Sequence, residues 1–242
     1  MKKQLKIVVL AKQVPDTRNV GKDAMTPEGT VNRAALPAIF NPEDLNALEM
    51  ALALKDETEG STVHILTMGP PRAADIIRDA MFRGADGGYL LTDRKFAGAD
   101  TLATSYALSC ALRKICPDVI VAGRQAIDGD TAQVGPQVAE KLGWPQVTYA
   151  EELLEIKADS LVVKRRLEHG TEIVECPLPL VMTVNGSAPE CRPQNAKRVM
   201  KYKFAQTKSE IAAAPDCMAS AMASAKLAKS TVASRTRKIT IL

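Results

Sequence analysis

The sequence is poor in the residues that zinc sites and nucleic-acid surfaces require. Its 242 residues include two histidines, too few for a three-histidine zinc site, and its aromatic content is 4% with a formal net charge of +4. Nucleic-acid surfaces need clustered positive charge, and single strands also need stacking aromatics. The composition therefore excludes nucleic acid as the expected partner.

Several catalytic motifs are also missing. The chain has no GxSxG nucleophile turn, no HExxH zinc motif and no GxxxxGK[ST] phosphate loop, each of which places specific groups for one chemistry. It also lacks the SGGxDS loop of ATP pyrophosphatases. A nucleotide held by this chain is therefore expected to be bound without being hydrolysed.

Cysteine usage and hydropathy favour a cytoplasmic protein with no membrane span. The five cysteines are odd in number, no two are spaced as CxxC, and they are predicted to be packing thiols of a reducing compartment: Cys110, Cys116, Cys176, Cys191 and Cys217. No apolar run approaches the roughly 20 residues that a helix needs to cross a bilayer. The apolar run IVVLA near the N-terminus is interrupted by Lys12, so it predicts a buried strand rather than a signal segment.

Strand and helix patterns alternate over the first 150 residues. Predicted strands are 6–12, 61–69, 88–92 and 118–123, and predicted helices begin at Pro42 and cover 70–85, 101–115 and 137–143. This alternation predicts an α/β fold with a parallel, twisted sheet flanked by helices. In such sheets ligands bind at the carboxyl ends of the strands, near a switch in strand order. The loops after Ala11, at 67–71 and at 123–136 should therefore gather at one edge.

The pattern changes after Gln146. Shorter extended runs separated by turn signals predict antiparallel strands added to the sheet. Residues 205–242 are rich in Ala, Ser and Lys and cannot bury much surface by themselves. We therefore expect a nucleotide-binding α/β domain over 1–204 and a C-terminal arm over 205–242.

The loop GRQAIDGDTAQVGP, residues 123–136, is the candidate ligand site. Gly123 is expected to turn the chain after a strand, and Gly129 to adopt positive φ. Asp128, Asp130 and Thr131 offer caps for the next helix, and Gln133 follows Asp130 at capping-box spacing. Backbone N–H groups here would suit a phosphate, with Arg124 adding a charge-assisted bond. The alternative is a plain strand-to-helix turn that needs glycine.

A second predicted feature is the helix start at Asn41-Pro42. Asn41 is the expected N-cap and Pro42 the first helical residue, with Glu43 and Asp44 facing the positive end of the helix dipole.

These segments resemble the β subunit of electron-transfer flavoproteins. The resemblance lies in KIVVLAKQVPD, NPEDLNALEMALALK, GRQAIDGDTAQVGPQVAEKLGWPQVT and the stretch VVKRRLEHGTEIVECPLPLVMT at 162–183. In that last stretch Arg165, Glu168, Gly170 and Glu172 match the family signature, whereas His169 stands where the family usually has Gly or an acid.

The resemblance implies that the loop wraps the phosphates of an adenine nucleotide. In ordinary members this nucleotide is structural AMP, and in flavin-bifurcating members it is a second FAD. The loop, TMGPP and GADTLAT (98–104) look like the bifurcating kind. The resemblance then implies FAD contacts from Ala11, Asn41, Asp44, Thr67, Met68, Gly69, Asp100, Thr101, Thr104, Gly123, Arg124, Gln125, Asp128, Gly129, Asp130, Thr131, Ala132, Gln133, Val134 and Gly135. Within this set Met68 is a candidate wall for the flavin ring, and small residues leave room for a pyrophosphate.

The implied function is electron transfer in a heterodimer with an electron-transfer flavoprotein α subunit. The implied redox partners are NADH, ferredoxin and an acyl-CoA dehydrogenase-type flavoenzyme. The family's partner-docking loop corresponds to 185–203, where Ala196 stands near the place of a family leucine. Two alternatives stay open: an ordinary carrier with AMP, and a nucleotide-sensing module without a redox role.

Overall fold

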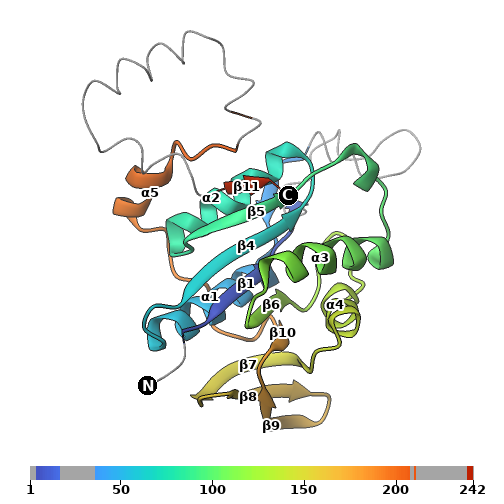
Figure 1. Ribbon diagram of the computed structural model, residues 1–242, viewed down its shortest axis with the longest axis vertical. Helices are drawn as coiled ribbons and strands as arrows, with labels where there is room; N and C mark the ends of the chain where they lie inside the picture. The colour runs from blue at the N-terminus through green and yellow to red at the C-terminus, as the bar shows by residue number, and fades with distance from the viewer. Residues whose placement is uncertain (1–3, 17–35, 208–209, 211–238, 242) are drawn as a thin grey trace.

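The structure, a computed structural model, describes residues 4–16, 36–207, 210 and 239–241 (Figure 1). The strands are β1 (Lys6–Leu10), β2 (Gln13–Pro15), β3 (Ala38–Phe40), β4 (Thr62–Met68), β5 (Gly87–Leu91), β6 (Val119–Gly123), β7 (Gln146–Ile156), β8 (Ser160–Leu167), β9 (Gly170–Pro177), β10 (Leu180–Val184) and β11 (Ile239–Ile241). The helices are α1 (Pro42–Glu57), α2 (Ala74–Arg83), α3 (Thr101–Ile115), α4 (Val134–Leu142) and α5 (Ala196–Tyr202), with 3₁₀ turns η1 (Pro71–Ala73) and η2 (Arg94–Phe96).

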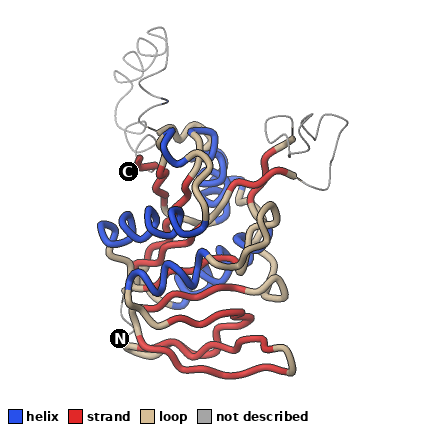
Figure 2. Tube along the Cα trace, turned by 90° about the vertical axis from the view of Figure 1, so that its right-hand side faces the viewer, coloured by secondary structure: helices blue, strands red, loops and turns tan. Residues whose placement is uncertain are grey.

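One sheet organises the described residues, with strand order β11-β5-β4-β1-β6-β10-β7-β8-β9. The strands from β11 to β7 pair in parallel, and β7, β8 and β9 pair antiparallel at the far end (Figure 1). The predicted α/β class with a parallel sheet and added antiparallel strands is therefore confirmed. β2 and β3 form a separate two-stranded antiparallel ribbon that projects from the body of the molecule (Figure 2).

The central strands are continuous apolar runs because helices cover both of their faces. α1 and α2 pack with residues such as Ile7, Val9 and Ile65 on one face. α3 and α4 pack with Val8, Leu66 and other residues on the opposite face. The switch in strand order falls at β1, which has β4 on one side and β6 on the other. The carboxyl ends of β1 and β6 are thus the expected ligand position.

Local signals placed most element boundaries. Asp100 caps α3 by accepting a hydrogen bond from the amide of Ala103 at 2.7 Å, and the helix ends at Cys116 in a left-handed conformation just before Pro117. α4 begins at Val134, earlier than the predicted start at 137, so Pro136 lies in its first turn, where its missing N–H costs no helical hydrogen bond. The predicted strand 6–12 ends earlier, at Leu10, and the ribbon strand β2 begins beyond it at Gln13.

The expectation of purely antiparallel strands after Gln146 is wrong for one of them. β10 inserts in parallel between β6 and β7, pairing Val181 with both Ile120 and Gln146. The register with β7 shifts near Thr183, and Tyr149 there has φ 58°. A short strand after a hairpin gives no local signal of which neighbours it will join.

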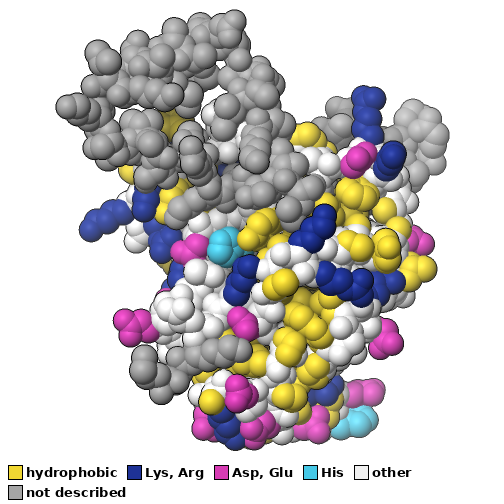
Figure 3. Space-filling model, viewed as in Figure 1, with side chains coloured by type: hydrophobic (Ala, Val, Ile, Leu, Met, Phe, Trp, Pro, Cys, Tyr) yellow, Lys and Arg dark blue, Asp and Glu magenta, His cyan; other side chains and the backbone are white. Residues whose placement is uncertain are grey.

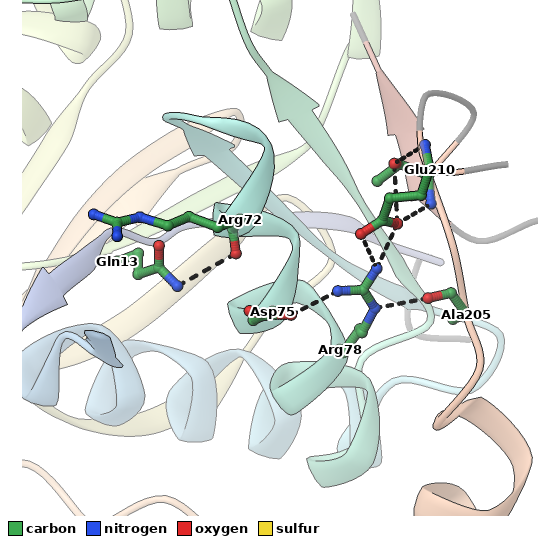
Figure 4. A network of polar contacts seen from close by, with 7 residues as sticks. Gln13, Arg72, Asp75, Arg78, Ala205 and Glu210 are labelled. Carbon is green, nitrogen blue, oxygen red and sulfur yellow. Dashed lines mark hydrogen bonds and ion pairs between the residues drawn. The ribbon is translucent and has the colours of Figure 1, made fainter. Parts of the chain in front are cut away.

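The described start of the predicted C-terminal arm is fastened to α2 (Figure 4). The guanidinium of Arg78 donates to the carbonyl of Ala205 at 2.7 Å and to the carboxylate of Glu210 at 2.5 and 2.6 Å. Glu210 also accepts from the amide of Thr207 at 2.7 Å, and its own amide donates to Oγ1 of Thr207 at 3.2 Å. The rest of the predicted arm, 208–209, 211–238 and 242, lies outside the described residues, so the predicted boundary at 204 stays a prediction. In the described part of the chain, no helix has the length and hydropathy to cross a bilayer.

Candidate functional site

The first turn of α1 holds the beginning of the loop after β6. The amide of Gly123 donates to Asp44 Oδ1 at 3.1 Å, and the amide of Gln125 donates to Glu43 Oε2 at 2.8 Å. Asn41 Nδ2 donates to the carbonyl of Gln125 at 2.8 Å, and Asn41 Oδ1 accepts from the amide of Ile127 at 3.2 Å. Side chains of the segment Asn41-Pro42-Glu43-Asp44 thus hold residues 123–127 in place through hydrogen bonds to their backbone.

Asn41 therefore does not act as the predicted side-chain cap. It occupies the N-cap position, yet its side chain makes no capping hydrogen bond to α1. Both ends of its amide are used by the loop instead, and the side chain is fully buried. A buried side-chain amide must satisfy its donors and acceptors. The side chain of Asn41 therefore bonds to the carbonyl and amide of the loop in place of the amides at the start of α1.

Asp44 joins the ends of two neighbouring strands. Its second oxygen, Oδ2, accepts from the amide of Lys12 at 2.8 Å, so one carboxylate binds the residues that follow β1 and end β6. Burial raises the pKa of Asp44 to about 7, although these two amides act in the opposite direction. Besides the predicted helix-dipole role, Asp44 therefore ties together the ends of β1 and β6 at the switch point.

Gly123 is required by the closeness of α1. A Cβ at this position would stand 2.7 Å from the carbonyl carbon of Glu43 and 2.8 Å from the amide nitrogen of Asp44. Both are backbone atoms that cannot rotate away. The start of α1 can approach the end of β6 because position 123 has no side chain.

The positive φ angles of the loop are not at Gly129. They occur at Asp130, with φ 48°, and at Ala132, with φ 52°, while Gly129 is absent from the left-handed residues and has open space around it. The expected conformation at Gly129 is therefore wrong. Gly135 also serves packing rather than a ligand, because a Cβ there would stand 2.5 Å from Cγ2 of Thr183.

The predicted caps of α4 are wrong as well. Gln133 is at the N-cap position without a side-chain cap, and its Oε1 accepts from Thr101 Oγ1 at 2.8 Å. Asp130 accepts from Gln125 Nε2 at 2.9 Å, and Asp128 binds Lys12. None of the predicted capping side chains binds the start of α4, so its first amides stay available to something else.

Those amides form the chemically distinctive part of the site. The N–H groups of residues 131–135 donate to no acceptor within the described part of the chain. Ala132 in the left-handed region is followed by Gln133 at φ −98° and ψ −29°. Successive N–H groups in this alternation converge into an anion-binding concavity, and the start of a helix adds the positive end of its dipole. The arrangement suits a phosphate group.

The two cations of the site are paired with carboxylates. Arg124 binds Glu43 at 2.9 Å, so the predicted free cation for a phosphate is engaged by α1 in this structure. Lys12 Nζ binds both oxygens of Asp128, at 2.7 and 2.9 Å. Backbone N–H groups rather than surplus side-chain charge are therefore the donors that the site presents.

Other predicted site residues lie around this edge. Ala11 directly follows β1, and its amide donates to the carbonyl of Leu66 at 3.1 Å. Thr101 brings the start of α3 against the loop, next to Asp100, which is occupied as a cap, and Thr104, one turn further.

The predicted flavin-ring contacts at the end of β4 divide between two faces of the sheet. Thr67 is fully buried, and its Oγ1 has no hydrogen-bond partner in the described structure. Met68 is half-buried and packs with the core under α3 and α4. Gly69 follows, with its amide donated to Leu91 at 3.1 Å. Because neighbouring strand residues point to opposite faces, Thr67 and Met68 cannot lie against one face of the same ring.

Two residues of this edge were missed as site residues. Sequence reasoning gives Glu43 only a helix-dipole role and Lys12 only the end of an apolar run. A cation two residues after a buried central strand is the available signal for Lys12. No group of three or more His, Cys, Asp or Glu residues in the described ranges is arranged to hold a metal ion.

Comparison with known proteins identifies one family and relatives named as its electron-transfer subunits. Residues 28–209 match the family described as "Electron transfer flavoprotein domain". The chain is 49% identical over 180 residues to the caffeyl-CoA reductase-Etf complex subunit CarD of Acetobacterium woodii, covering 74% of this chain and 68% of that protein. It is 50% identical over 179 residues to the electron transfer flavoprotein subunit beta of Clostridium acetobutylicum, with shares of 74% and 68%. It is 51% identical over 182 residues to the acryloyl-CoA reductase electron transfer subunit gamma of Anaerotignum propionicum, with shares of 74% and 67%.

Proposed function

Because the chain belongs to the electron transfer flavoprotein family, as a β-type electron-transfer subunit, we propose that it binds FAD at the switch-point edge and serves NADH-dependent electron bifurcation. The observation that carries the proposal is the set of unpaired amides at 131–135, at the start of α4. Family membership removes the alternative of a nucleotide-sensing module without a redox role.

The residues present fit the phosphates of such a dinucleotide. The amides of 131–135 converge without competition from a capping side chain. Position 123 and its partners on α1 fix where the loop begins, so the donors are set before the ligand arrives. Preorganised donors avoid the cost of ordering a loop during binding.

A flavin at this edge would supply the redox chemistry, by accepting a hydride and passing its electrons on singly. The chain's own part is binding, orientation and exclusion of water. Met68, on the α3 side of the sheet, would offer an apolar, polarizable contact to a bound ring. Thr101, which contacts Gln133 of the loop, would offer its hydroxyl oxygen as a hydrogen-bond acceptor.

The proposed partners are an α subunit, NADH, ferredoxin and an acyl-CoA dehydrogenase-type flavoenzyme. Two relatives are named as subunits of caffeyl-CoA and acryloyl-CoA reductase systems, which supports an acyl-CoA-type acceptor. Cys110, Cys116, Cys176 and Cys191 are free thiols, which supports a place in a reducing cytoplasm.

Two exposed surfaces suit protein partners. Hydrophobic side chains gather over α3 and α4 (Figure 3), where Leu102 and Tyr106 are 58% and 62% exposed. On α5, Met200 is 63% exposed between basic residues, while Ala196 is expected near the place of the family leucine. We assign the redox-partner contact to Met200, because a single exposed apolar side chain within a basic rim suits an acidic docking surface. The α-subunit contact predicted for the arm is assigned to residues 211–238, which lie outside the described residues, because Ile239–Ile241 pair with β5 of this chain.

AMP as a structural ligand is the second candidate. The pairing of Lys12 with Asp128 and of Arg124 with Glu43 favours it, because a single phosphate needs fewer donors than a pyrophosphate. Under this alternative the subunit is an ordinary electron carrier.

The test is a cofactor count on the heterodimer purified with its α subunit. Absorbance of released flavin and chromatography of released nucleotides should give two flavins per heterodimer and no AMP. Stopped-flow mixing with NADH should bleach flavin rapidly only in preparations with FAD in this chain. One flavin plus one AMP, or equally fast bleaching with AMP bound, would replace this proposal with the ordinary carrier.

A further inference from the structure

One ion pair at this edge joins two loops, and its basic member, Lys12, is not among the residues expected to contact the cofactor. Lys12 Nζ lies 2.7 and 2.9 Å from the two oxygens of Asp128. The side chain of Asp128 is 5% exposed and that of Lys12 is 46% exposed. Because one partner is shielded from water, the pair is less screened than an ordinary surface ion pair.

The backbone of Lys12 is fixed independently of its side chain. Its amide donates to Asp44 at 2.8 Å, and its carbonyl accepts from the amide of Asn41 at 3.1 Å. Lys12 lies two residues after the end of β1, the strand beside β6 at the switch point. Its ammonium group therefore reaches from a rigid base toward the neighbouring loop.

The loop after β6 has a firmly held half and a less firmly held half. Residues 123–127 are bound to Asn41, Glu43 and Asp44 on α1. Residues 128–133 carry the left-handed conformations at Asp130 and Ala132, which are unfavourable for side-chain-bearing residues. The Lys12–Asp128 ion pair holds this half at its first residue, and the hydrogen bond from Thr101 to Gln133 holds it at its last residue.

We propose that Lys12 is a positioning residue that, through Asp128, holds residues 128–133 in the conformation in which the amides of 131–135 converge on a nucleotide phosphate. This rests on the proposed nucleotide site and adds a determinant of its affinity. Nucleotide retention then depends on the pair rather than on either charge alone.

A direct role for Lys12 as a phosphate ligand would have the opposite signature. Asp128 would then compete with the phosphate for the ammonium group, and removing its charge would tighten binding. In the positioning role, removing either charge weakens binding, and removing the second adds little. The sign of the Asp128→Asn effect separates the two.

The experiment measures dissociation constants for FAD and for AMP on the nucleotide-stripped heterodimer. The variants are Lys12→Met, Asp128→Asn, their double mutant and the conservative Lys12→Arg. Lys157→Met is the control, since it breaks a similarly short ion pair, 2.6 Å to Glu175, between the turn after β7 and strand β9. We expect each single change to weaken binding of the retained nucleotide about tenfold, as for loss of one charged hydrogen-bonded contact.

The double mutant should bind the nucleotide no more weakly than the single mutants. Lys12→Arg should bind within about threefold of the parent because it keeps the charge and the hydrogen-bond donors. The control Lys157→Met should bind like the parent. Tighter binding by Asp128→Asn, strictly additive losses in the double mutant, or unchanged binding in both single mutants would overturn the positioning role while leaving the nucleotide site intact. A parent heterodimer that binds neither FAD nor AMP would overturn the nucleotide site and this role together.

Discussion

Replacing Gly123 by alanine should damage the site more than the same replacement at Gly129. Both glycines lie in the loop after β6, and both changes add one methyl group. At 123 the new Cβ would stand 2.7 and 2.8 Å from backbone atoms of Glu43 and Asp44, whereas at 129 nothing lies within 4 Å. The pair therefore isolates the effect of the close approach between α1 and β6.

The magnitude follows from two contributions. Ordinary Cβ contacts begin near 3.4 Å, so α1 must retreat by several tenths of an ångström, and overpacking of this kind costs about 1–3 kcal/mol. The retreat also stretches the 3.1 Å hydrogen bond from the Gly123 amide to Asp44, which adds about 1–2 kcal/mol. The free energy of unfolding should fall by roughly 2–5 kcal/mol, and the nucleotide should be lost on gel filtration because the segment that holds the loop has moved.

The assay is thermal unfolding of parent, Gly123→Ala and Gly129→Ala heterodimers, together with a nucleotide count after gel filtration. The midpoint for Gly123→Ala should fall by roughly 5–15 °C, while Gly129→Ala should stay within about 2 °C of the parent with full nucleotide. Equal behaviour of the two variants would refute the reasoning that α1 positions the loop by direct backbone contact.

Three further outcomes are expected. Ala132→Gly should raise the free energy of unfolding by about 0.5–1 kcal/mol and Ala132→Val should lower it, because φ is 52° there; urea unfolding checks both, and the reverse order would count against this conformation. Burial raises the pKa of Asp44 from 3.8 to about 7, so the folded protein keeps a proton that the unfolded chain releases, and the free energy of unfolding should fall as pH rises from about 4 to about 7 and then level off; Asp44→Asn should flatten this slope, and an unchanged slope would contradict it. Met200→Glu should slow electron transfer to the acyl-CoA-type partner without changing NADH bleaching, whereas Leu154→Glu, at an exposed position of β7, should not; equal effects in steady-state assays would remove Met200 from the docking surface.

The alternation of elements was readable from the sequence because each signal is local. Asp100 caps α3 and Pro117 follows its end, and both act through neighbouring backbone groups. The apolar runs of β1 and β6 have no polar alternation because helices cover both faces, which predicts a parallel sheet with its loops at one edge. Locally determined features such as these place the candidate site at the carboxyl ends of the strands.

The start of α4 shows where local reasoning failed. Spacing predicted that Asp130 and Gln133 form a cap, whereas these side chains bind Gln125 and Thr101. Gly129 was expected to take the left-handed conformation, because glycine adopts it at the lowest cost, yet the loop places it at Asp130 and Ala132. The conformation of a loop follows from its fixed ends and its partners, which can override the preference of one residue.

The sequence by itself determined the class of fold and predicted the edge at which a ligand is expected, together with most of the residues gathered at that edge. Only the tertiary structure decided what those residues do. Asn41 turned from a helix cap into a support for residues 125 and 127, and Lys12 became the partner of Asp128, 116 positions further along the chain. The physical reason is that a buried polar or charged group must find a partner wherever the fold supplies one. Sequence patterns report the partners a few residues away, and the fold of the sheet supplied the others by placing the ends of β1 and β6 beside the first turn of α1.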